Sequence, residues 1–197
     1  MEKRCATVER TTKETDIKVN LCLDGEGRSN VDTGIPFFDH MLTAFARHGL
    51  MDLDVACKGD IDVDGHHSVE DVGIVLGQAI ADALGDKRGI NRFADRSIVM
   101  DEALVMCAMD ISGRGGLYWQ MDIPVGAILT FDTQLAKEFF VAVAQNAQIS
   151  LHLVQIAGEN AHHIIEASFK AFGRALRTAV EIDPRIEGVI PTTKGVL

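Results

Sequence analysis

One short motif occurs twice in this chain, 96 residues apart, and this internal repeat limits the possible folds more than any other feature. The pattern His-His-x-x-Glu stands at residues 66–70 and again at 162–166. After each copy, apolar residues recur every three or four positions, which predicts an amphipathic helix. A repeat of about 95 residues has the length of a duplicated half-domain and exceeds that of a solenoid unit. The sequence therefore predicts two related halves.

The same order of elements is expected in both halves. Alternating apolar residues predict strands, and helical spacing predicts helices, at matching places along the chain. The matched segments are strands at 17–23 and 103–111, helices at 40–48 and 138–146, and strands at 53–57 and 149–154. A glutamate also precedes a glycine by eleven residues in each half, and these glutamates are Glu14 and Glu102.

These elements predict an α+β fold of internally duplicated half-domains, each a small mixed sheet with helices packed on one face. The halves are expected at about 1–88 and 89–185, joined in the polar, glycine-containing stretch 85–89 and followed by a C-terminal tail at 186–197. Each half is too short to be stable alone, so we expect residues 1–197 to form a single domain.

Composition excludes several kinds of partner. The formal net charge of −10 argues against a nucleic-acid partner, which calls for a basic surface. No apolar run approaches the roughly 18 residues of a membrane span, and no signal-peptide pattern follows Met1. We therefore expect a cytoplasmic protein with no membrane partner. None of the four cysteines belongs to a C-x-x-C pair, which predicts buried free thiols at Cys5, Cys22, Cys57 and Cys107.

The repeated motif carries the chemistry of a metal ligand set. On a helix the first histidine and the glutamate lie four positions apart, share a face and can bind one ion. The second histidine points about 100° away, so adjacent imidazoles are expected to serve different ions. Imidazole combined with carboxylate suits Mn, Fe, Ni or Zn. A histidine pair that only bonds the backbone would explain one copy of the motif, but it explains two copies poorly.

Five segments closely resemble the imidazoleglycerol-phosphate dehydratase family. They are residues 33–42, 62–71, 112–114, 158–170 and 191–195. The resemblance extends over essentially the whole chain, and the paired motifs with these flanks are highly specific. It implies a hydro-lyase that dehydrates D-erythro-imidazoleglycerol phosphate to imidazole acetol phosphate in histidine biosynthesis. It also implies self-association into a 24-subunit homo-oligomer with active sites between subunits.

The resemblance further implies two Mn²⁺ ions in each active site. The first ion would take His40, His67, His162 and Glu166. The second ion would take His66, Glu70, His163 and Glu138. Glu138 stands where some relatives carry histidine, and His152 is the alternative for this last ligand. The predicted strand position of His152 matches Asp54 of the first half and does not match His40.

Other positions match family residues that bind the substrate or act on it. Guanidinium and ammonium groups suit a phosphate, and a threonine hydroxyl can donate to a phosphate oxygen. The implied substrate-binding residues are Glu14, His40, His48, His66, Glu70, Arg92, Arg114, His162, Lys170, Thr192, Thr193 and Lys194. The implied catalytic residues are Glu14, Glu166 and His67. For His48, a helix-end histidine beside the carbonyl dipole is an equally good interpretation.

The chemistry of the reaction suggests a mechanism. The hydrogen lost in this dehydration is not acidified by a carbonyl, so we hypothesise that two ions bind the substrate's imidazole and favour loss of its N–H proton. The dimanganese-bound imidazolate then expels hydroxide, and Glu14 takes the neighbouring C–H proton. Two other classes use similar ligands. A dinuclear hydrolase would activate water, and a metal-storage protein would have no need of Arg114 or Lys194. Incubation with the substrate and Mn²⁺ would separate the three.

Overall fold

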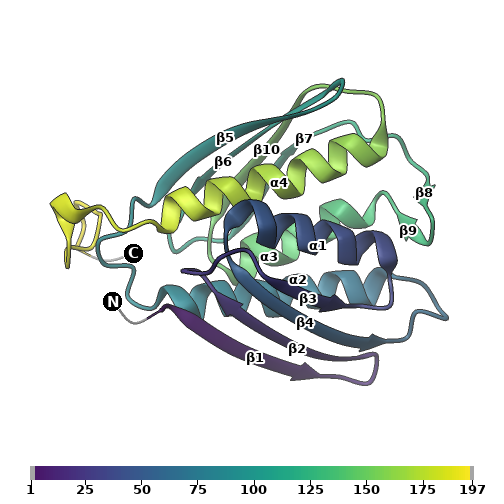
Figure 1. Ribbon diagram of the computed structural model, residues 1–197, viewed down its shortest axis with the longest axis horizontal. Helices are drawn as coiled ribbons and strands as arrows, with labels where there is room; N and C mark the ends of the chain where they lie inside the picture. The colour runs from purple at the N-terminus through teal and green to yellow at the C-terminus, as the bar shows by residue number, and fades with distance from the viewer. Residues whose placement is uncertain (1–2, 196–197) are drawn as a thin grey trace.

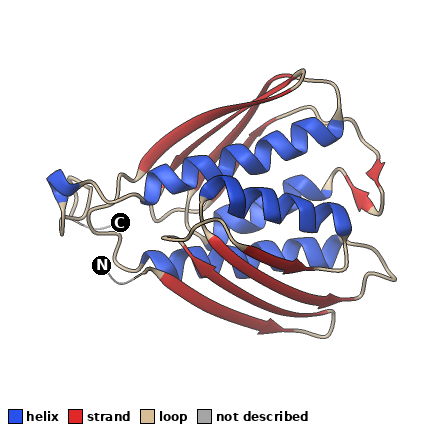
Figure 2. Ribbon diagram, viewed as in Figure 1, coloured by secondary structure: helices blue, strands red, loops and turns tan. Residues whose placement is uncertain are grey.

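Two four-stranded sheets enclose a layer of four helices, as Figures 1 and 2 show. The computed structural model describes residues 3–195, so the outermost residues of the predicted first half and of the predicted tail 186–197 lie outside it. The first half comprises β1 (Cys5–Thr11), β2 (Thr15–Cys22), β3 (Ser29–Asp32), α1 (Pro36–Gly49), β4 (Asp52–Gly59) and α2 (His66–Leu84). The second half comprises β5 (Phe93–Met100), β6 (Ala103–Asp110), β7 (Gly116–Gln120), α3 (Leu135–Asn146), β10 (Ser150–Ala157) and α4 (Ala161–Val180).

The two sheets have the same strand order. The first runs β1-β2-β4-β3 and the second β5-β6-β10-β7. In each sheet three strands are antiparallel, and the last strand pairs parallel with its neighbour. A short hairpin of β8 (Ala127–Ile128) and β9 (Phe131–Asp132) is added in the second half, and a 3-10 turn at Pro184–Ile186 follows α4. The predicted α+β class and its duplicated half-domains are confirmed.

Local sequence patterns account for the faces that these elements bury. Ile17, Val19 and Leu21 alternate along β2 and point to the helix layer, as expected for a sheet covered on one side. The helix that follows each repeated motif buries its periodic apolar residues, so α2 and α4 lie between the sheets with little exposed apolar surface. Between residues 3 and 195, no helix has the length and continuous apolarity that crossing a bilayer requires.

The helices pair across the two halves. Helix α1 packs against α4, and α2 packs against α3. Both contacts depend on glycine: a methyl group at Gly173 would lie 2.6 Å from the carbonyl oxygen of Phe45, and one at Gly77 would lie 2.9 Å from that of Val143. Gly77 and Gly173 are 96 residues apart, at the same place in the repeat. The same close helix approach therefore occurs twice.

Phenylalanine side chains fill the centre between the halves. Phe38 of α1 meets Phe139 of α3 edge to face at a centroid distance of 5.3 Å. Phe139 in turn stacks on Phe169 of α4 at 4.9 Å. All three are fully buried, and each such side chain contributes about 1.5–3 kcal/mol through removal of apolar surface from water. The halves thus share one hydrophobic core.

The prediction of four free buried thiols is wrong for two of the cysteines. Cys5 and Cys22 form a disulfide, because the antiparallel register of β1 and β2 places them directly opposite each other. Cys57 and Cys107 are free and buried, as predicted. Burial raises the pKa of the Cys57 thiol to about 11, so this thiol stays protonated and unreactive at neutral pH.

We expect Gly173→Ala and Gly77→Ala each to destabilise the protein by about 1–3 kcal/mol, because the added methyl groups press on backbone that cannot move aside. Thermal unfolding followed by circular dichroism would measure the change. Gly126→Ala is the matched control, since nothing lies within 4 Å of the position of its methyl group. Equal melting temperatures for all three variants would contradict the close-packing argument.

Candidate metal and substrate site

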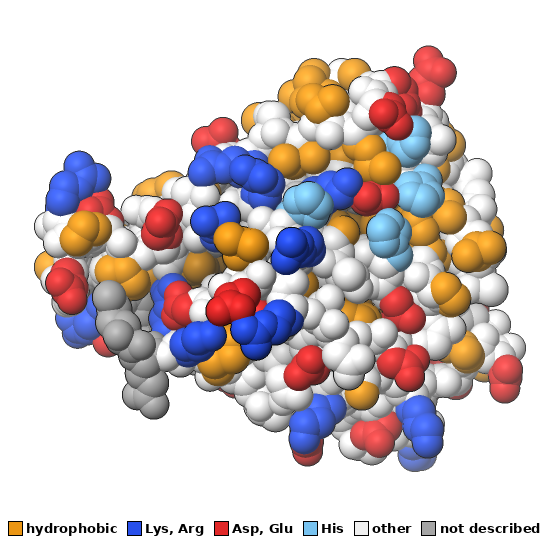
Figure 3. Space-filling view, viewed as in Figure 1, with side chains coloured by type: hydrophobic (Ala, Val, Ile, Leu, Met, Phe, Trp, Pro, Cys, Tyr) orange, Lys and Arg blue, Asp and Glu red, His pale blue; other side chains and the backbone are white. Residues whose placement is uncertain are grey.

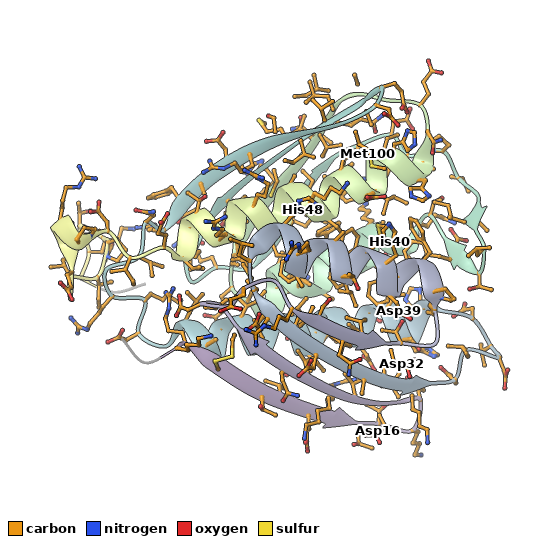
Figure 4. The ribbon with its side chains drawn as sticks, in the orientation of Figure 1. Asp16, Asp32, Asp39, His40, His48 and Met100 are labelled. Carbon is orange, nitrogen blue, oxygen red and sulfur yellow. A yellow bond between two sulfur atoms is a disulfide. The ribbon has the colours of Figure 1, made fainter. Side chains whose placement is uncertain are left out.

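Three predicted ligands from α1 and α4 meet at one carboxylate. Nε2 of His40 lies 3.3 Å from Oε2 of Glu166, and Nε2 of His162 lies 3.0 Å from the same oxygen. One ligand atom from each residue falls within 4.8 Å of the others, a combination found nowhere else among residues 3–195. Figure 4 shows His40 on α1, beside α4. We call this group the α1–α4 cluster.

The surroundings of the α1–α4 cluster keep its carboxylate charged. Burial alone would raise the pKa of Glu166, but the ammonium of Lys170, 2.7 Å from Oε1, and the two imidazoles lower it overall. The side chain of Asn160 accepts hydrogen bonds from the backbone N–H groups of His162 and His163. This N-cap fixes the start of α4 and with it the orientation of the motif.

A related group occurs on α2 and α3. Nε2 of His66 lies 3.7 Å from Oε2 of Glu70, one turn along α2. His66 and Glu138 of α3 line one pocket of about 340 Å³. His152 lies elsewhere: it is exposed on the outer face of β10 and stacks on Tyr118 at 4.4 Å. The geometry therefore favours Glu138 over His152, and we call His66, Glu70 and Glu138 the α2–α3 cluster.

The second histidine of each motif stands apart from these clusters within the chain. Nδ1 of His67 lies 3.0 Å from Oδ2 of Asp60, while its Nε2 is 3.8 Å from Glu14. Nδ1 of His163 lies 2.7 Å from Oε2 of Glu102. These hydrogen bonds raise the pKa of both imidazoles and help to lower the pKa of Glu102 to about 2.

Sequence reasoning did not identify Asp60 and Glu102 as site residues. For Glu102 a signal existed, because the repeat aligns it with Glu14. For Asp60 the sequence offered none, since the strand register that matches Asp54 with His152 places Gly158 opposite Asp60.

The predicted phosphate-binding residues gather at a second place. A cavity of about 430 Å³ is lined by Arg92, Phe93, Arg114, Pro191, Thr192, Thr193 and Lys194. The guanidinium of Arg92 donates to both carboxylate oxygens of Asp110, at 2.7 and 3.2 Å, and to the carbonyl of Pro191 at 2.8 Å. Arg92 therefore holds the C-terminal segment in place, whereas the exposed Arg114 and Lys194 keep donors for an anion.

Within one chain the cavity and the α1–α4 cluster lie far apart. The backbone N–H of Arg92 donates to the carbonyl of Ala179 near the end of α4, whereas His162 begins that helix. Seventeen residues of helix separate Ala179 from His162, which is about 25 Å at 1.5 Å per residue. Figure 3 shows most of the histidine side chains of this face toward its right-hand end, whereas Lys and Arg side chains are spread over the face.

His48 lies in the last turn of α1, next to α4 (Figure 4). Its partial burial, together with the positive charges of Lys170 and Arg174, lowers the pKa of its imidazole. A neutral imidazole is a weak partner for the helix dipole, so this environment disfavours the dipole interpretation. It leaves a neutral ring that can donate or accept a hydrogen bond.

Comparison with known proteins agrees with this arrangement. The family model for imidazoleglycerol-phosphate dehydratase matches residues 33–176. Dehydratases of that name from Gloeobacter violaceus and Gluconacetobacter diazotrophicus are 56% and 57% identical to this chain, over 100% and 98% of both sequences. This chain belongs to the imidazoleglycerol-phosphate dehydratase family.

Two crystal structures named for the same family are also similar to this chain. The dehydratase from Staphylococcus aureus superposes with a TM-score of 0.82 and 38% identity, covering 91% of this chain and 99% of that one. The enzyme from Pyrococcus furiosus, in complex with (S)-C348, superposes with a TM-score of 0.83 and 38% identity, covering 96% of this chain and all of that one. The chain is thus a hydro-lyase, a dehydratase of histidine biosynthesis.

A buried polar group of this dehydratase chain connects Glu14 to the first motif. Asp71, on α2 and 7% exposed, accepts a hydrogen bond of 2.5 Å from the hydroxyl of Thr15 and pairs with Arg10 at 2.5 Å. Thr15 directly follows Glu14 in the turn between β1 and β2, and His67 lies one helical turn before Asp71. Asp71 therefore fixes the hairpin that carries Glu14 against the helix that carries His67.

We expect Asp71→Asn to lower the free energy of unfolding by about 1–3 kcal/mol, because it weakens hydrogen bonds between charged groups and leaves Arg10 without its counter-charge. Chemical denaturation followed by fluorescence of the single Trp119 would measure the change. Asp82→Asn is the control, since Asp82 is exposed on the same helix. If the two variants were equally stable, the buried group would contribute nothing to the fold.

Proposed function

We propose that this dehydratase converts imidazoleglycerol phosphate to imidazole acetol phosphate at a site that holds two Mn²⁺ ions. The observation that carries the proposal is the duplicated donor set, His40, His162 and Glu166 in one cluster and Glu138, His66 and Glu70 in the other. Imidazole nitrogens and carboxylate oxygens in this mixture fit Mn²⁺. Bound Mn²⁺ would supply Lewis acidity toward the nitrogens of the substrate's imidazole.

Each cluster offers three ligands, which do not complete the coordination of a Mn²⁺ ion. His67 and His163 are the predicted ligands that belong to neither cluster. In the proposed site these come from neighbouring copies of the chain: His67 joins the α1–α4 cluster and His163 joins the α2–α3 cluster. The separation of about 25 Å along α4 supports shared sites, because a small substrate cannot span from a metal cluster to the phosphate cavity of the same chain. We therefore propose a homo-oligomer, and the family resemblance points to 24 subunits.

Side chains of this protein would bind the phosphate, transfer the proton and hold the metal ligands in place. Arg114, Thr193 and Lys194 bind the phosphate and orient the substrate. Glu14 is exposed on its turn, 3.8 Å from a proposed metal ligand, and takes the C–H proton next to the imidazole. Glu166 and His67 hold the metal-binding geometry, and Lys170 keeps Glu166 ionised. His48 lies on α1, near Lys170 and Arg174 of α4. We propose that its imidazole contacts the substrate.

Incubation of the protein with imidazoleglycerol phosphate and Mn²⁺ tests the proposal directly. We expect the ketone product to accumulate and a chelator to stop its formation. Hydrolysis of the phosphate without ketone formation would instead indicate a dinuclear hydrolase. Metal binding without turnover of any kind would indicate a storage protein.

We predict that Glu14→Gln lowers kcat by about 10²–10⁴-fold while metal content stays normal, because the amide cannot accept the proton. Lys194→Ala and Arg114→Ala should mainly raise KM, by roughly 10–100-fold, since each removes a charged hydrogen-bond donor from the phosphate. Steady-state kinetics separate the two effects. Glu9→Gln, on the exposed side of β1, is the control. Wild-type kcat in Glu14→Gln would move the proton transfer to another residue.

We also predict that metal removal dissociates the assembly, because an ion that binds only between subunits stabilises the assembled form by mass action. Light scattering should show a large particle with Mn²⁺ and smaller species after chelation, while circular dichroism changes little because the core is independent of metal. A particle of monomeric mass at saturating Mn²⁺ would refute shared sites. An unchanged particle after complete stripping would show that other contacts hold the subunits together.

A further inference from the structure

We propose that Asp60 and Glu102 are positioning residues that set the tautomer of the two remaining histidines, His67 and His163. Each carboxylate accepts the Nδ1–H of its imidazole and thereby leaves the Nε2 lone pair available for a metal ion. The inference rests on the proposed function in one respect, namely that His67 and His163 bind metal. The close Nδ1–carboxylate contacts from which it starts, at 3.0 and 2.7 Å, do not depend on that function.

The first pair is held by the backbone as well as by the side chains. Both carboxylate oxygens of Asp60 face Nδ1 of His67, at 3.0 and 3.2 Å. The backbone N–H of Asp60 donates to the carbonyl of Glu14 at 3.1 Å, which ties the end of β4 to the turn that carries Glu14. The carboxylate therefore approaches the imidazole from a fixed direction.

The second pair is held more tightly still. One oxygen of Glu102 lies 2.7 Å from Nδ1 of His163. The other oxygen accepts the backbone N–H groups of Asn160 and Glu159, at 2.9 and 3.3 Å, just before the start of α4. With both oxygens engaged, the carboxylate is locked between the β5–β6 turn and the helix.

These contacts divide the histidines of the motifs into two classes. In His162 and His66 the nitrogen that faces a glutamate of the same motif is Nε2, at 3.0 and 3.7 Å, as expected for two ligands that converge on one ion. In His67 and His163 the nitrogen next to the orienting carboxylate is Nδ1. A neutral imidazole has one N–H, and a carboxylate can only accept, so the proton resides on Nδ1 and Nε2 is the free ligand atom. Such outer carboxylates also increase ligand basicity.

The arrangement also distinguishes Glu14 from Glu102, its counterpart in the repeat. Glu102 is the repeat counterpart of Glu14, and the orientation of His163 occupies it fully. In the first half Asp60, whose counterpart in the strand register is Gly158, orients His67 instead. Glu14 is thereby released from this structural role, and its side chain makes no hydrogen bond among the described residues.

The test measures Mn²⁺ binding to chelator-stripped protein by titration calorimetry. Asp60→Ala and Glu102→Ala should each weaken binding by roughly 10–100-fold at one of the two ion positions, which is the usual effect of removing such an outer carboxylate. Asp62→Asn and Glu159→Gln are the controls, because each removes one nearby exposed charge whose side chain contacts neither imidazole. If an alanine variant fails to fold, Asp60→Leu and Glu102→Met, which keep a side chain of similar size without an acceptor oxygen, are measured in its place.

A second readout does not involve the metal. In metal-free protein above the imidazole pKa, ¹⁵N NMR should show protonated Nδ1 for His67 and His163, and the substituted protein should lose this preference at the affected ring. Unchanged Mn²⁺ affinity together with unchanged tautomers in both variants would overturn the inference. Failure of the wild-type chain to bind two Mn²⁺ ions per site would overturn the proposed function instead, so the two failures are distinguishable.

Discussion

The close approach of helices from opposite halves is the constraint on which the rest of the structure depends. Each half presents its helices to the other, and glycines at equivalent repeat positions let the α1–α4 and α2–α3 pairs meet backbone to backbone. These crossings bring His40 beside the second motif and Glu138 into the pocket that His66 lines. A half-domain folded alone would separate these side chains. The ligand clusters are therefore a product of the packing between the halves.

In the proposed function, the same packing leaves a single chain without a complete metal site. Repeat symmetry yields the α1–α4 cluster and the related α2–α3 cluster, and it leaves the second histidine of each motif outside them, with its Nδ1 next to a carboxylate. In the proposed site, association of subunits resolves the mismatch without distortion of any element. Metal binding would then stabilise the association of subunits, and association would in turn strengthen metal binding.

Much of the fold was predictable because it is encoded locally. Alternating burial in β2 and β6 and the helical spacing after each motif depend on near neighbours in the sequence, and the repeat doubled the signal. The disulfide was not predictable by the same means, because the pairing of Cys5 with Cys22 depends on strand register. The glycine contacts depend on helix crossing, and the role of Asp60 depends on where a loop residue falls beside α2. Family resemblance supplied the substrate-binding residues, which no periodicity indicates.

Charge distribution connects the two ends of the proposed site. The chain carries a net charge of −10, yet Arg114 and Lys194 present cationic groups around one cavity, while Asp110 engages Arg92 so that the C-terminal segment stays in place. A phosphate would therefore meet a local positive field within an acidic molecule, and the acidic remainder would favour divalent cations near the carboxylate clusters. Within one chain about 25 Å of helix α4 separates the cationic cavity from the α1–α4 cluster, so their opposite charges do not neutralise each other. If neighbouring subunits place the cationic cavity of one chain beside the metal cluster of another, the phosphate and the imidazole of one substrate molecule can be bound at the same time.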